Sequence, residues 1–432
     1  MTIMPNKYLE ELRPLPSAKL NSGKAQIVNL GGKWTYMNVM TESNLHIRVI
    51  HNKLIAELDK YLDMARTELE YAWPIDVPSS QEWQEVDIQQ TMRTLVARMT
   101  ARVFIGNPAC RDDKWLKLSI DYAIDIFTAA FVLRMFPTWT HPLIARLIPA
   151  RSRVKKHLQL AQRIFKPLMD KHADTVIKRR EGQQVDEEDT LLNWMMDHGT
   201  EDENKVEKMA ARQAILTLAS IHTTSMAVTH IIFDLCAYPE WVPVLREEIN
   251  SITAELGPIN SAPENGPKQW LARLEKLDSF LLESQRINPP LLLAPQRVLA
   301  EALTLKDGTH IPKGSRICWA AYDHMNDASV TPNPEVFDPM RSYRKRYASP
   351  EQQHKFLAGQ TSPDSLAFGY GKPACPGRYW AIGEIKLILA RLILQYDFRF
   401  PEGVQSRPRT FYADENMFPD PNARIMMRLR EK

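Results

Sequence analysis

One short stretch, FGYGKPACPGR from Phe368 to Arg378, constrains the fold of this chain more than any other. It surrounds a single cysteine, Cys375, with three glycines and two prolines, although glycine is scarce, at 16 of 432 residues. After Arg378, apolar residues recur at helical spacing. Cys375 is therefore expected just before or within the first turn of a helix, where the helix dipole and unpaired N–H groups favour an ionised sulfur.

The glycines around Cys375 indicate what such a sulfur could bind. Glycine lets the backbone approach a flat and bulky group without a Cβ clash, and Phe368 could pack beside the same group. Haem iron requires of a cysteine ligand a thiolate in a tight loop with N–H donors aimed at it. The stretch predicts such a ligand; the alternative is a buried structural cysteine at a tight turn.

Length and composition limit the class of protein. A chain of 432 residues should form one large compact unit or two lobes that share an interface. Its formal charge of +3, from 55 basic and 52 acidic residues, argues against nucleic-acid binding by phosphate neutralisation. The N-terminus does not resemble a signal peptide, and no uninterrupted apolar run approaches the roughly 20 residues that span a bilayer. We therefore expect no integral membrane segment in this sequence.

The cysteines are scattered singly, which predicts neither a zinc module nor a disulfide scaffold. They are Cys110, Cys236, Cys318 and Cys375.

The hydrophobic pattern is mostly helical. The longest predicted helix is apolar over most of its middle and is expected to be a buried central helix. Strand-like pieces at 303–305 and 317–320 are predicted to be joined by the turn at Asp307-Gly308. The stretch 341–364 reads as irregular. Helices are predicted for residues 46–71, 86–104, 115–136, 151–180 and 204–238.

The stretch around Cys375 resembles the haem-binding loop of cytochrome P450 enzymes, Phe-x-x-Gly-x-x-x-Cys-x-Gly, at every fixed position. The resemblance implies a mainly α fold with small β-sheets, a single domain over 1–432, and a haem-binding region at about 275–400. It implies haem b as cofactor and Cys375 as the axial thiolate ligand of its iron. Phe368, Gly371 and Gly377 become candidate cofactor-binding residues.

Glu283 and Arg286 match the Glu-x-x-Arg pair of the same family, on one face of a predicted helix. Taken alone, such a pair is usually a surface ion pair. The resemblance implies instead a buried network completed by a later arginine, here Arg341. Its expected role is structural, since it would hold the core on the haem side.

The long helix carries LASIHTTS, from Leu218 to Ser225, where the family places its oxygen-activating residues. By resemblance Thr223 is the alcohol beside the oxygen site. His222 stands where an acid is usual; imidazole could relay protons, but a satisfied core histidine is the alternative. Ser220 in place of glycine would narrow the groove. The sequence IHTTS also resembles a fungal branch related to ent-kaurene oxidases, which serve secondary metabolism.

Arg297 follows the Glu-x-x-Arg helix and by resemblance reaches a haem propionate. Two usual propionate partners are replaced, by Pro373 in the haem loop and by His51 upstream, which puts haem retention in question. Candidate substrate-pocket residues are mostly apolar, with ordinary core packing as the alternative for the leucines. They are Phe127, Phe131, Leu291–Leu293, Met417 and Phe418.

The expected activity is that of a haem-thiolate monooxygenase acting on a bulky apolar secondary metabolite, terpenoid or alkaloid. It would use O2 and electrons from NADPH delivered by a separate cytochrome P450 reductase, because the chain lacks a Gly-x-Gly-x-x-Gly fingerprint. Lys372, Arg378 and Lys386 are candidates for the reductase-docking face, with a simple solvated side chain as the alternative for each. The alternatives are a haem-thiolate isomerase or dehydratase that does not use O2, and an inactive or weakly haem-binding truncated paralogue.

The resemblance runs from about Asn6 to the C-terminus. Relatives of this kind begin with a membrane anchor, a Pro-rich hinge, a first helix and several strands, and the sequence is expected to lack these. A full-length relative would lie at the cytosolic face of the endoplasmic reticulum membrane.

Overall fold

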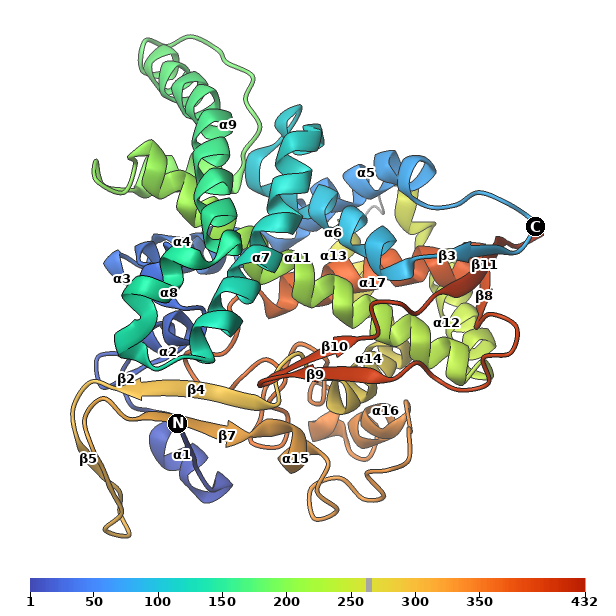
Figure 1. The fold of residues 1–432 in the computed structure, drawn as a ribbon. Helices are drawn as coiled ribbons and strands as arrows, with labels where there is room; N and C mark the ends of the chain where they lie inside the picture. The colour runs from blue at the N-terminus through green and yellow to red at the C-terminus, as the bar shows by residue number, and fades with distance from the viewer. Residues whose placement is uncertain (262–265, 432) are drawn as a thin grey trace. The chain divides into compact units, whose positions relative to one another are not determined.

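The computed structural model of the protein describes residues 1–261 and 266–431 (Figure 1). Its internal contacts divide the chain into two compact units. Unit 1 comprises Met1–Ser22, Leu69–Leu95 and Thr223–Lys432, and unit 2 comprises Gly23–Glu68 and Val96–His222. Four helices have residues in both units: α2 (Ser22–Asn29), of which Ser22 alone belongs to unit 1, α5 (Leu58–Asp76), α6 (Ile88–Ile105) and α11 (Val206–Ala237).

The described part of unit 2 is helical. Its two longest elements, α7 (Asp113–Arg134) and α9 (Pro149–Arg180), pack against each other. Helix α7 begins where the Asp112 carboxylate accepts the Lys114 N–H, and α9 begins with proline, which lacks the N–H that a first turn leaves unpaired. The shorter elements are α2 (Ser22–Asn29), η2 (Gly32–Trp34), α3 (Val39–Glu42), α4 (Leu45–Val49), η3 (Ile50–Ile55), η4 (Ala109–Arg111), η5 (Thr138–Thr140), α8 (His141–Leu147) and α10 (Leu191–His198).

Unit 1 contains the sheets. A four-stranded sheet has the order β1-β7-β4-β2, in which β4 pairs antiparallel with β7 and β1 pairs parallel with β7. A three-stranded sheet has the order β3-β11-β8, and two hairpins pair β9 with β10 and β5 with β6. The strands are β1 (Thr2–Ile3), β2 (Leu20–Asn21), β3 (Gln84–Val86), β4 (Leu293–Leu299), β5 (Leu303–Thr304), β6 (His310–Ile311), β7 (Arg316–Ala320), β8 (Tyr396–Arg399), β9 (Thr410–Ala413), β10 (Asn416–Pro419) and β11 (Ile425–Leu429).

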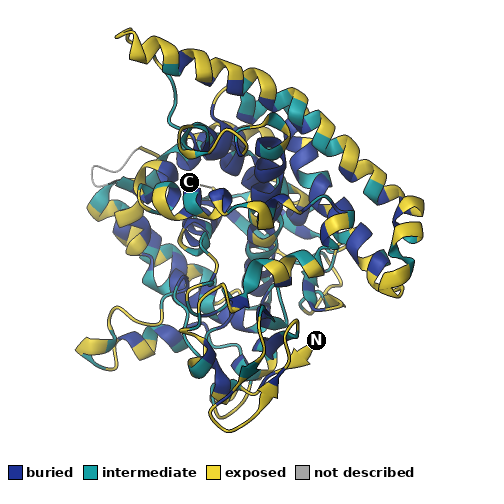
Figure 2. Cartoon of the chain, turned by 90° about the vertical axis from the view of Figure 1, so that its left-hand side faces the viewer, coloured by how far each residue is buried: buried dark blue, intermediate teal, exposed yellow. Residues whose placement is uncertain are grey.

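Unit 1 also contains helices, and Figure 2 shows buried, intermediate and exposed residues along the helices of the chain. Helix α17, directly after the Cys375 loop, is buried on most of its faces. The helices are η1 (Asn6–Tyr8), α1 (Leu9–Leu12), α12 (Trp241–Leu256), η6 (Ile259–Ser261), α13 (Gly266–Ala272), α14 (Glu275–Ile287), α15 (Ala321–Met325), α16 (Arg341–Arg346), η7 (Pro350–Gln352) and α17 (Arg378–Gln395).

Helix α11 is the longest predicted helix. Among the described residues, it is the one helix long and apolar enough by length and composition to cross a membrane. However, 67% of its most apolar window is buried inside the protein. The expected long and mostly buried helix is therefore present, and packing covers most of its apolar residues.

Several local predictions were wrong. The turn at Asp307-Gly308 joins β5 to β6 and not to β7, because Leu303 and Thr304 pair with Ile311 and His310. The stretch 341–364 is not wholly irregular, since it contains α16 and η7.

The predicted helix 46–71 is divided into α4, the π-helical turn η3 and α5. The short strands β1 and β2, from the first 22 residues, were not predicted, because two-residue strands show no alternation of apolar and polar residues.

Candidate active site

The loop before α17 owes its shape to glycine. Gly369 and Gly371 have φ of +74° and +76°, in the left-handed region that other residues rarely adopt. The Cys375 N–H donates to the Phe368 carbonyl at 2.8 Å, which closes the loop, and α17 then starts with Gly377 as its N-cap. The cysteine therefore precedes the first turn of a helix, as predicted.

Cys375 is an exposed residue, and the protein atoms around its thiol still desolvate it. Burial raises the pKa of the Cys375 thiol, whereas the backbone N–H groups of Gly377 and Arg378 and the charge of Arg378 act in the opposite direction. The N–H groups that the sequence predicted at this sulfur are thus present. Helix-terminal donors of this kind stabilise an anionic sulfur or a metal-bound thiolate.

Arg297, on β4, is buried without an anionic partner among the described residues. Its Nη1 donates to the Gln296 carbonyl at 2.7 Å, and its Nη2 donates to the Tyr370 carbonyl at 3.0 Å. Burial lowers its pKa to about 10. A buried cation held only by neutral carbonyls is suited to receive an anionic group of a ligand, and Tyr370 places it beside the Cys375 loop.

Glu283, Arg286 and Arg341 come together as predicted. On α14, Arg286 donates to both Glu283 oxygens, from Nη2 at 2.7 Å and from Nε at 3.0 Å. The Nε of Arg341 lies 3.4 Å from Glu283, and the Asp338 N–H donates to the same carboxylate at 3.0 Å. Both arginines also donate to backbone carbonyls between Pro332 and Val336. The network thus fixes the segment that leads into α16.

Thr223 and Phe368 line one small cavity in unit 1, of about 50 Å³. Met417, one of the predicted pocket residues, lines it too. The other lining residues are Thr224, Met226, Ala227, His230, Gln285, Asn288, Pro290, Ala367, Ala381 and Ile385.

His222 belongs to unit 2 and is half-buried. Its Nε2 lies 3.0 Å from the Ile120 carbonyl on α7, a contact in which Nε2 must carry the hydrogen. This geometry matches the core-histidine alternative, with the ring tied to a backbone carbonyl. Ser220 likewise donates to a carbonyl, that of Leu216, at 2.9 Å.

The other predicted pocket residues are spread over both units. Leu291 and Leu292 lie beside the turn before β10, since Leu291 bridges to Asn416 and the Leu292 N–H donates to the Glu415 carbonyl at 2.8 Å. Leu293 begins β4, and Phe418 is half-buried in β10. On α7 in unit 2, Phe127 is half-buried and Phe131 is 46% exposed.

The prediction of Lys386 as a docking residue was wrong. Its ammonium is buried and pairs with Asp278 at 2.6 Å, because α17 turns this position inward. Arg378 is half-buried and donates to the Gly359 and Cys375 carbonyls, whereas Lys372 is exposed. Of the three predicted docking residues, Lys372 is the one fully available on the surface.

The two departures from the family pattern differ in surroundings. Pro373 is half-buried in the Cys375 loop, where it carries no charge and no N–H donor. His51 is exposed within η3.

Sequence reasoning missed His230 and Gln285. His230 follows Thr223 by seven residues, which is two helical turns along the same face of α11, so its position in the cavity could have been inferred. Gln285 occupies a variable position of the Glu-x-x-Arg motif, so the motif itself predicts no role for it. Both are buried polar side chains in a mostly apolar lining.

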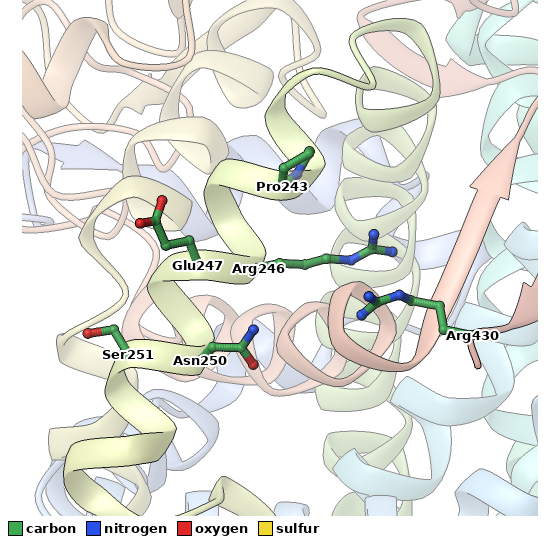
Figure 3. A pocket seen from close by; sticks show the side chains of 6 residues that line it. All are labelled: Pro243, Arg246, Glu247, Asn250, Ser251 and Arg430. Carbon is green, nitrogen blue, oxygen red and sulfur yellow. The ribbon is translucent and has the colours of Figure 1, made fainter. Parts of the chain in front are cut away.

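A shallow surface pocket of about 580 Å³ lies along α12 (Figure 3). Its Arg246 is engaged by the Ile393 and Tyr396 carbonyls and by Asp397, so the guanidinium has a structural role. None of the predicted site residues lines it. The lining residues are Pro243, Arg246, Glu247, Asn250, Ser251 and Arg430.

The motif order and the loop geometry agree with a comparison to known families, in which the model for cytochrome P450 matches residues 17–426. The chain belongs to the cytochrome P450 family. The cytochrome P450 monooxygenase sdnB of Sordaria araneosa is 40% identical over 100% of this chain and 78% of its own length. The monooxygenase ATR4 of Stachybotrys chlorohalonatus is 43% identical over 99% of this chain and 80% of its own.

An ent-kaurene oxidase, P450-4 of Gibberella fujikuroi, is 37% identical over 100% of this chain and 83% of its own length. The solved structure of cyanobacterial CYP120A1, described as bound to retinoic acid, shares the fold with a TM-score of 0.68 at 18% identity, over 98% of this chain and 87% of that one. The predicted mainly α P450 fold and the relation to fungal monooxygenases are therefore confirmed. The chain is a cytochrome P450 monooxygenase.

Membership of this family makes haem b, with a cysteine thiolate as axial ligand, the cofactor. The residues present fit that group. An exposed cysteine receives N–H donors from a helix start, and a buried guanidinium beside the same loop has only neutral partners among the described residues.

Proposed function

We propose that this P450 oxygenates a bulky apolar secondary metabolite, with Cys375 as the axial ligand of its haem. The observation that carries the proposal is the Cys375 loop, where an exposed cysteine meets the N–H groups of Gly377 and Arg378 at the start of α17. Phe368 lines the neighbouring cavity, and Gly371 supplies the left-handed turn. We also propose that residues 1–432 act as a single P450 domain.

Each remaining site residue has one proposed task. Haem bound at Cys375 would supply the activation of O2 for insertion of one oxygen atom into the substrate. Arg297 would bind a haem propionate by a charge-assisted hydrogen bond. The Thr223 hydroxyl, which lines the cavity, would hold and pass protons to the reaction centre. The network around Glu283 would keep the surrounding core rigid.

The substrate class is proposed as terpenoid or alkaloid. An ent-kaurene oxidase among the relatives supports this choice. Electrons would come from NADPH through a separate cytochrome P450 reductase that docks near Lys372. We propose that the protein acts at the cytosolic face of the endoplasmic reticulum membrane.

A carbon monoxide difference spectrum of the reduced protein tests the ligand. The unmodified chain should show the red-shifted Soret band of a thiolate-ligated haem. The variant Cys375→Ser should lose it, whereas Cys236→Ala, which removes another thiol of the same unit, should keep it. A normal band in Cys375→Ser would refute the assignment.

His222 replaces the usual acid, so an O2-independent isomerase or dehydratase is the second candidate. Turnover without NADPH and reductase would favour that candidate. Strict dependence on both would exclude it.

A further inference from the structure

One histidine in the cavity is held in a fixed protonation state. Arg407 Nη2 lies 2.9 Å from His230 Nδ1. Because a guanidinium can only donate, Nδ1 must accept, and the hydrogen of the neutral imidazole then sits on Nε2. Burial and the charge of Arg407 keep the pKa of His230 well below its ordinary value. The ring is therefore a neutral group with one N–H donor still to use.

The arginine that fixes this tautomer is itself anchored. Its Nε pairs with Asp234 Oδ1 at 2.5 Å, and the Ser284 hydroxyl donates to Asp234 Oδ2 at 2.5 Å. Asp234 is buried on α11, one turn after His230. Arg407 cannot rotate away without taking the cation from the buried Asp234 carboxylate, which would keep the Ser284 hydroxyl as its donor.

Two polar atoms of the cavity lack partners within the described parts of the chain. His230 Nε2 and Gln285 Oε1 are buried and make no hydrogen bond there. Their residues are only 3% and 7% exposed, and both line the cavity that contains Thr223. Buried donors and acceptors are nearly always paired in native proteins, so an unpaired donor and an unpaired acceptor on two residues that line one cavity indicate a bound group.

The chemistry of the pair selects that group. A carboxylate could accept from His230 but would place its lone pairs against the Gln285 oxygen. An ammonium could donate to Gln285 but would meet the His230 N–H and the nearby charge of Arg407. A hydroxyl group both accepts and donates, and it therefore satisfies both side chains. The space of about 50 Å³ is sufficient for a water molecule or a small alcohol.

We propose that His230 and Gln285 form a binding site for one hydroxyl oxygen, from a water molecule or from an alcohol. The inference rests on the proposed haem site, since Phe368 and Thr223 line the same cavity. It adds a polar recognition point to a lining that is otherwise mostly apolar.

Crystal structures of the haem-loaded chain, with and without an ethanol soak, test the proposal. One oxygen should lie within hydrogen-bond distance of both His230 Nε2 and Gln285 Oε1. Density that becomes elongated after the soak identifies an alcohol as a possible source, and round density in both crystals identifies water. No oxygen between the two side chains, or a haem edge filling this space, overturns the proposal.

A double-mutant cycle gives a second readout. If His230→Phe and Gln285→Leu remove the same bound oxygen, the double variant should lower the melting temperature by about as much as the more severe single variant. Additive shifts overturn the shared site. The carbon monoxide spectrum of the unmodified chain tests the haem ligand separately, so a normal thiolate band without the bound oxygen defeats this inference alone.

Discussion

Removing the charge of Glu283 should destabilise the protein far more than removing the charge of an exposed glutamate. In the Glu283–Arg286 pair the side chains are 3% and 8% exposed, and the two hydrogen bonds measure 2.7 and 3.0 Å. The change Glu283→Gln keeps the shape of the side chain but leaves Arg286 and Arg341 with no carboxylate partner in the described part of the chain. Breaking a buried ion pair at one partner costs about 3–5 kcal/mol.

The expected change in melting temperature follows from chain length. An unfolding entropy of about 2.1 cal/mol/K per residue gives roughly 0.9 kcal/mol/K for the whole chain. A loss of about 3–5 kcal/mol then lowers the melting temperature by about 3–6 °C. Thermal unfolding of the haem-loaded protein, followed by far-ultraviolet circular dichroism, measures the shift.

Glu255 provides a matched control. Arg273 also donates to both of its oxygens, at 2.9 and 2.8 Å, but the side chains are 53% and 48% exposed. An exposed pair contributes little to stability because water and salt screen it, so Glu255→Gln should shift the melting temperature by about 1 °C or less. Equal shifts for the two variants would refute the reasoning that burial makes the Glu283 network strong.

Three further changes have defined outcomes. Arg297→Leu should weaken haem retention roughly 10- to 150-fold, the equivalent of a charge-assisted bond, measured as the haem-to-protein ratio after gel filtration; unchanged retention would contradict its propionate role. Lys386→Met should lower the free energy of unfolding by about 3 kcal/mol without changing the KM for reductase. Lys372→Glu should raise that KM at unchanged stability. A KM raised by Lys386→Met and not by Lys372→Glu would contradict docking near Lys372. For His46, burial lowers the pKa to about 4. The unfolded chain takes up this proton near pH 6.5, so stability present above that pH is lost as the pH falls toward 4, by about 3 kcal/mol. The urea midpoint of unfolding, measured as a function of pH, should therefore fall less steeply between pH 6.5 and 4 in His46→Leu than in the unmodified chain. An unchanged slope would contradict this role of His46.

Local sequence patterns were sufficient for much of the candidate site. The Cys375 loop depends on glycines at left-handed positions and on a helix that starts immediately afterwards, and both are encoded within about ten residues. Glu283 and Arg286 lie one helical turn apart, so their contact also follows from local geometry. Their meeting with Arg341, which lies in another helix, was predicted from family resemblance and not from spacing.

Other features depend on contacts between distant segments. Whether Lys386 points to solvent or into the protein depends on what packs against its side of α17. Asp278 lies on that side and pairs with the Lys386 ammonium, so the side chain points inward. The two-residue strands β1 and β2 exist because β7 and β4 offer partners. The strand that follows the turn at Asp307-Gly308 and pairs with β5 was likewise decided by strand pairing and not by the turn residues.

The amino-acid sequence by itself determined the family, the cysteine loop and the helical character, because each rests on residue types within a few turns of one another. Only the tertiary structure decided that Arg297 is buried beside the Tyr370 carbonyl and that Arg407 fixes the tautomer of His230. These contacts join residues 73 and 177 positions apart. Hydrogen bonds and burial at such separations are set by packing, on which the local sequence pattern has no direct bearing.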